Sequence, residues 1–129
     1  MATLRAHALI DAAPDAVWEV VGDSTGISRW FPAITSSTGD AERRTVVLEG
    51  GVRLHEEVVT ADPRLRRFQY RIIGGDLEVA HHLGTVDVID VGGGRSLVVY
   101  STDVEPAELA EQFGPAIEDA VGNLASVIG

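Results

Sequence analysis

Glu56, Tyr70 and His82 are the residues of this sequence whose types and positions could support chemistry. Each lies in a segment where apolar and polar residues alternate, and each falls on the apolar side of its segment. Arg67 and Arg71 must face water, so Tyr70, which has the opposite parity in the same strand, faces inward. A carboxylate, a phenol and an imidazole in a dry cavity could anchor a ligand or transfer protons, because burial shifts their pKa values.

The turns between these segments predict which of the side chains are neighbours. A turn centred near Pro63 pairs Glu56 with Tyr70, and a turn near residues 75–76 places Tyr70 opposite His82. Directly paired residues on one face of a sheet lie about 4.5–5.5 Å apart at Cβ. We therefore expect one row of three side chains across adjacent strands, provided that no one-residue bulge shifts the register.

Further residues are expected to line the same cavity. Tyr100 lies on the more apolar face of the last strand, and the glycine turn near residue 93 pairs it with Val86. Both faces of the segment 43–49 are mixed, so no inward residue is predicted there. The catalytic candidates are Glu56, His82 and Tyr70, and the expected ligand contacts are Glu56, Tyr70, Ile72, His82, Gly84, Tyr100, Phe113 and Ile117.

A combination of strands and helices must position these residues. Residues 3–11 alternate as a first strand, and Pro14 opens a short helix that ends at Gly22. A second short helix is expected over residues 27–31, where the following proline stops it. From about residue 34 to 104 the hydrophobic period is two, and regular turn signals divide this region into six strands.

After Pro106 the hydrophobic period becomes helical. Gly114 and Pro115 interrupt the pattern, so we expect a kink there or a helix whose regular part begins at Pro115. The predicted fold is α+β, with a curved seven-stranded antiparallel sheet wrapped around a long C-terminal helix and two short helices between strands 1 and 2. It forms a single domain over residues 1–129, and the gap between sheet and helix is a place for a small ligand.

Composition limits the partners of this chain. Its 129 residues include 20 acidic and 10 basic ones, a formal charge of −10 that repels phosphate backbones and anionic membranes, so no nucleic-acid partner is expected. The absence of cysteine, and the opposite directions of His81 and His82, argue against a metal site or other cofactor. Without a spanning segment or signal peptide, we expect a cytoplasmic monomer or homodimer with no membrane insertion.

The opening of the chain resembles that of the SRPBCC superfamily, which has the START-like helix-grip fold. Residues 8–33 read ALIDAAPDAVWEVVGDSTGISRWFPA, and the segments Pro14–Trp18 and Trp30–Pro32 carry the resemblance. Residues 68–88 are similar to plant abscisic-acid receptors and to bacterial polyketide cyclase/dehydrase-like members. The resemblance covers essentially the whole chain and implies the fold, but the superfamily includes carriers, receptors and cyclases, so it does not define an activity.

The resemblance implies roles for only some positions. Glu56 falls where the receptors have an inward Glu that helps to hold ligand and water, and Tyr70 and Ile72 fall on cavity-lining positions. His82 replaces a receptor Tyr, and Gly84 replaces a Ser. Because the gate sequence and the inward Lys of the receptors have no counterpart here, a plant-hormone receptor is not supported.

Three functions are compatible with these patterns. The first is a binding module that holds a small hydrophobic molecule of polyketide, lipid or aromatic type. The second is a cyclase or dehydratase in which Glu56 is the base, or orients His82 as the base, while Tyr70 or Tyr100 polarises a carbonyl. The third is an interaction protein with a vestigial cavity. Each polar residue also has a purely structural interpretation, as a group that satisfies its neighbours or a water inside the core.

Overall fold

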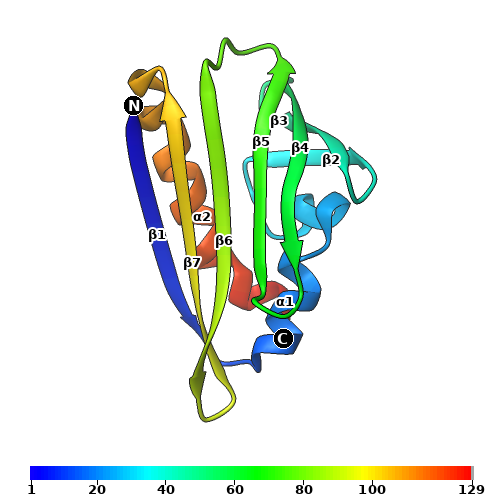
Figure 1. Cartoon of the computed structure of the whole chain (residues 1–129), viewed down its shortest axis with the longest axis vertical. Helices are drawn as coiled ribbons and strands as arrows, with labels where there is room; N and C mark the ends of the chain where they lie inside the picture. The colour runs from blue at the N-terminus through cyan, green and yellow to red at the C-terminus, as the bar shows by residue number, and fades with distance from the viewer. Residues whose placement is uncertain (129) are drawn as a thin grey trace.

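The structure, a computed structural model, describes residues 1–128, and these form one seven-stranded antiparallel sheet with a long helix across one face (Figure 1). The strand order is β1-β7-β6-β5-β4-β3-β2. The strands are β1 (Ala2–Ile10), β2 (Ile34–Gly39), β3 (Arg43–Leu48), β4 (Arg53–Asp62), β5 (Arg67–Gly75), β6 (His81–Gly92) and β7 (Arg95–Glu105). The helices are α1 (Pro14–Val21), the 3-10 helices η1 (Ser24–Arg29) and η2 (Ala107–Leu109), and α2 (Ala110–Ile128). The predicted α+β architecture is confirmed.

Helix α2 runs through Pro115 rather than beginning there, which corrects one of the two expected outcomes. Proline has no N–H, so one hydrogen bond of the helix is missing, which costs about 3 kcal/mol. Burial of a Val, Leu or Ile side chain contributes about 1.5–3 kcal/mol, so the packing of the helix against the sheet offsets this loss. The buried face consists of Ile117, Ala120, Val121 and Leu124.

The second short helix begins earlier than predicted, because η1 covers Ser24–Arg29 instead of residues 27–31. The N–H groups of Trp30 and Phe31 both bond to the carbonyl of Ile27, which closes the helix with a turn. Both aromatic side chains are buried in the core. None of the helices in the described part of the chain is both long and apolar enough to cross a membrane.

The predicted register around β5 is wrong by two residues in both hairpins. Tyr70 pairs with Val58 rather than with Glu56, and with Gly84 rather than with His82. Both connections are centred later than predicted, because residues 63–66 separate β4 from β5 and residues 76–80 separate β5 from β6. The irregularities in β4 change the first register by only one residue. A shift of two keeps each side chain on its face, so the predicted inward residues still point inward.

The hairpin of β6 and β7 has the predicted register, with Val86 opposite Tyr100. Strands β5 and β6 pair only along residues 67–70 of β5. Beyond that point the backbone N–H of Ile72 donates to the side chain of His82. The end of the ladder thus positions a titratable side chain.

Candidate functional site

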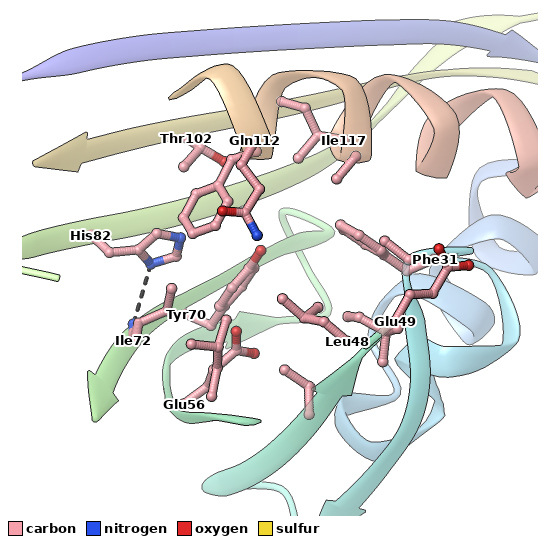
Figure 2. A pocket seen from close by; sticks show the side chains of 16 residues that line it. Phe31, Leu48, Glu49, Glu56, Tyr70, Ile72, His82, Thr102, Gln112 and Ile117 are labelled. Carbon is pink, nitrogen blue, oxygen red and sulfur yellow. Dashed lines mark hydrogen bonds between the residues drawn. The ribbon is translucent and has the colours of Figure 1, made fainter. Parts of the chain in front are cut away.

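A pocket of about 240 Å³ lies between the sheet and α2. Figure 2 shows side chains from the strands below and from α2 above converging on it. Its apolar lining consists of Phe31, Ala33, Ile34, Val46, Leu48, Leu54, Ile72, Phe113, Ala116 and Ile117. Its polar lining consists of Glu49, Glu56, Tyr70, His82, Thr102 and Gln112.

Glu56 forms a buried ion pair with Arg44, its direct partner across β3 and β4. The Nε of Arg44 donates to Oε1 of Glu56 over 2.8 Å, and the two side chains are 1% and 5% exposed. Burial raises the pKa of Glu56, while the charge and the hydrogen bond of Arg44 act in the opposite direction. The carboxylate at the base of the pocket therefore has a permanent counterion.

Arg44 holds several elements together beneath the pocket. Its Nη1 donates to the carbonyl oxygen of Ser24 over 2.7 Å. Its guanidinium carbon lies 4.7 Å from the ring centre of Tyr70 and 5.2 Å from that of Phe68, within the range of cation–π interactions. Arg44 is thus fixed by a carboxylate, a backbone carbonyl and two aromatic rings.

Tyr70 stands between Glu56 and His82 in the wall of the pocket (Figure 2). Its hydroxyl forms a hydrogen bond with the hydroxyl of Tyr100, which is fully buried. Burial raises the pKa values of both tyrosines, so both remain protonated at neutral pH. A Cβ atom at Gly84 would lie 2.5 Å from the ring of Tyr70, so this position must be glycine for the ring to fit.

His82 is 5% exposed, and its Nδ1 accepts a hydrogen bond from the backbone N–H of Ile72 over 3.2 Å. Burial is the main cause that lowers its pKa to about 4. The imidazole is therefore neutral at pH 7, and because Nδ1 is an acceptor, the ring carries its proton on Nε2. Its ring centre lies 5.2 Å from that of Tyr70 and 6.1 Å from that of Phe113.

The structure brings most of the sequence-predicted residues to one pocket. Glu56, Tyr70, Ile72, His82, Phe113 and Ile117 line it. Gly84 and Tyr100 do not, which corrects their prediction as ligand contacts: Gly84 is covered by the ring of Tyr70, and Tyr100 supports Tyr70 from behind. Glu56 bonds to Arg44 and not to His82, so the version in which Glu56 orients His82 as a base does not fit this geometry.

Arg44 is the functional residue that sequence reasoning missed. Arg43 and Arg44 are adjacent, so parity alone cannot tell which of them faces inward. The turn at Gly50 held the necessary signal, because counting outward from it along both strands pairs Arg44 with Glu56. In the described part of the chain, no group of three or more His, Cys, Asp or Glu side chains could hold a metal ion.

A curved sheet around a C-terminal helix, with a pocket between them, is the START-like helix-grip fold. Over residues 1–129 the chain matches the family described as "Polyketide cyclase / dehydrase and lipid transport", and it belongs to that family. No curated protein sequence matches the chain.

Solved structures share the fold. XoxI from Bacillus cereus is 23% identical, with a TM-score of 0.90 over 99% of this chain and 96% of that one. A START superfamily protein from Mycobacterium smegmatis is 14% identical, with a TM-score of 0.83 over 98% and 96%. Norcoclaurine synthase from Thalictrum flavum is 19% identical, with a TM-score of 0.75 over 98% and 93%. The similarity to abscisic-acid receptors stays a prediction from the sequence.

Removing one member of the buried ion pair should destabilise the protein strongly. Arg44→Met leaves the Glu56 carboxylate unpaired, and we expect the free energy of unfolding to fall by roughly 3–5 kcal/mol in urea titrations. The double variant Arg44→Met/Glu56→Leu should regain most of this loss. The control is the exposed pair of Arg71 and Glu57, also 2.8 Å apart, where Arg71→Met should cost at most about 1 kcal/mol. Equal losses of unfolding free energy in Arg44→Met and Arg71→Met would contradict the prediction that the buried ion pair matters more than the exposed one.

His82 should make the stability of the fold depend on pH. The unfolded chain binds a proton on this residue near pH 6.5 and the folded chain only near pH 4, so the free energy of unfolding falls as the pH drops through this window. At pH 4.5 the penalty should reach roughly 2–3 kcal/mol relative to pH 7. His82→Phe should lose this contribution, and His81→Phe, which removes an exposed imidazole from the same strand, should keep it. The same pH dependence in all three proteins would refute the prediction.

Proposed function

We propose that this chain binds a small apolar molecule, of polyketide, lipid or aromatic type, in the pocket between the sheet and α2. The main support for this proposal is the pocket itself. It combines a mostly aliphatic and aromatic lining with a few polar groups, the composition typical of small-molecule sites. The family description, which includes lipid transport, supports the same class of ligand.

The hydrogen bonds around the pocket favour binding over catalysis. Glu56 is paired with Arg44, the hydroxyl of Tyr70 is paired with that of Tyr100, and Nδ1 of His82 is occupied by a backbone N–H. These bonds hold the three side chains in fixed positions and so give a rigid wall. Such a wall can select a ligand by shape.

A second candidate is an acid–base enzyme of the cyclase or dehydratase type. The observation in its favour is that Glu56, with a raised pKa, shares the pocket with a neutral imidazole. In this alternative Glu56 takes a proton from a carbon next to a carbonyl of the substrate. Norcoclaurine synthase, a structural neighbour, is an enzyme by its name, so the fold is compatible with catalysis.

Filling the pocket should abolish binding. N-phenyl-1-naphthylamine, an uncharged probe that fluoresces in apolar surroundings, should bind the native chain saturably. Ala116→Phe places a phenyl group in the pocket and should weaken binding about tenfold or more, because the probe and the new ring compete for one volume. Glu118→Phe adds the same ring to the exposed side of α2 and should leave the affinity unchanged. Equal affinity of both variants would refute the proposal, and native mass spectrometry of the purified protein would identify a retained ligand.

Proton exchange separates the binder from the enzyme. If the chain only binds its ligand, the methyl protons of 2-acetylnaphthalene should exchange with D₂O at the uncatalysed rate. NMR measures this exchange. Exchange that the chain accelerates tenfold or more would favour the enzyme. Its loss in Arg44→Met/Glu56→Gln, but not in Arg44→Met, would assign the base to Glu56. Glu56→Gln alone is a poor test, since it leaves Arg44 buried without its counterion.

A further inference from the structure

The proposed binding function leaves the polarity of the ligand open, and the polar atoms of the pocket restrict it. Tyr70 and Tyr100 satisfy each other, and Oε1 of Glu56 accepts from Arg44. Among the described residues, Nε2 of His82 and Oε2 of Glu56 have no hydrogen-bond partner, and neither belongs to the fully covered polar atoms. The two atoms are therefore accessible from the pocket.

Nε2 of His82 is a hydrogen-bond donor at neutral pH. The backbone N–H of Ile72 occupies Nδ1, which fixes the proton of the neutral ring on Nε2. Figure 2 shows this second ring nitrogen turned away from Ile72 and toward the side of Gln112. Gln112 is exposed, and the hydroxyl of Thr102 is fully covered, so His82 supplies the buried donor of this wall.

Among residues 1–128, no cation lines the pocket that could neutralise an acidic ligand. Glu49 and Glu56 line it, whereas none of the described arginines does, and the sequence has no lysine. The nearest guanidinium, that of Arg44, is already paired with Glu56 beneath the ring of Tyr70. A carboxylate ligand would lose its hydration without gaining a counterion, in a pocket that already holds the carboxylate of Glu49.

We infer that the pocket selects an uncharged ligand with a carbonyl oxygen, which accepts a hydrogen bond from Nε2 of His82, and that it rejects carboxylates of the same shape. This inference rests on the proposed binding function and defines the ligand class of that pocket. Lipids that fit it are neutral ketones or esters rather than ionised fatty acids. His82 is then the residue that determines specificity.

Three matched probes test the inference. 2-Acetylnaphthalene has the carbonyl, 2-isopropenylnaphthalene replaces the oxygen by CH₂, and 2-naphthoate replaces the methyl ketone by a carboxylate. By titration at pH 7, the ketone should bind roughly 3- to 10-fold tighter than the alkene, as one hydrogen bond provides. The naphthoate should bind about 100-fold weaker than the ketone or worse. Isotope-edited infrared spectra should show the carbonyl stretch of the bound ketone below its frequency in hexane.

The variants assign the hydrogen bond to a residue. His82→Phe keeps a ring of similar size but removes the donor, so the ketone and the alkene should bind equally and the infrared shift should disappear. His82→Gln restores an N–H donor and should regain part of both effects. His81→Phe, on the opposite face of the same strand, should behave like the native chain.

The outcomes separate the two proposals. Equal binding of ketone and alkene to the native chain, without an infrared shift, would overturn the role of His82 and leave the binding function intact. Naphthoate that binds as well as the ketone would overturn the selection against carboxylates. If no probe binds the native chain, the binding function falls, and this inference falls with it. The infrared measurement on the native chain needs no variant, so a His82 variant that fails to fold does not prevent the test.

Discussion

The buried ion pair of Arg44 and Glu56 is the interaction on which the pocket depends. A charge removed from water is tolerated only with a partner and with hydrogen bonds to its remaining polar atoms. For Arg44 these are a carboxylate on β4, which accepts from Nε, and the carbonyl of Ser24 on η1, which accepts from Nη1, while Nη2 is buried without a hydrogen-bond partner among the described residues. The rings of Tyr70 and Phe68 on β5 add cation–π contacts. The pair therefore fixes the relative positions of β3, β4, β5 and η1, the elements beneath the pocket.

The same pair determines the electrostatics of the pocket. Because Arg44 and Glu56 neutralise each other, the polar character of the lining comes from neutral groups, from the unpaired oxygen of Glu56 and from the carboxylate of Glu49. Burial keeps Tyr70 and Tyr100 protonated and His82 unprotonated, so these aromatic groups carry no charge at neutral pH. A pocket of this kind distinguishes uncharged ligands by shape and by single hydrogen bonds, and its described lining offers no counterion to an anionic one.

The sequence predicts which face of a strand a side chain lies on more accurately than it predicts which residues pair between neighbouring strands. Alternation places Glu56, Tyr70 and His82 on the inner face because a buried strand must present its apolar side to the core, and two-residue shifts do not change this. The pairing depends on every bulge and loop between the strands, and these have no strong local signal in β4. Gly84 and Tyr100 were correctly placed inside the protein, but whether an inward residue reaches the pocket depends on the ring of Tyr70, which covers Gly84. Such contacts depend on how the sheet curves around α2.

Whether Glu56 could act as a base depends on its partner as well as on its burial. Burial makes a carboxylate a stronger base, whereas a guanidinium that donates to it and never loses its proton makes it a weaker one. At Glu56 both effects act on one group, and burial is the larger cause, so the pKa of Glu56 is raised although Arg44 opposes the change. The ion pair that stabilises the floor of the pocket thereby also limits the chemistry that the pocket can perform. The cation on β3 contacts the carboxylate but not the pocket, so it can set the basicity of Glu56 without touching a ligand.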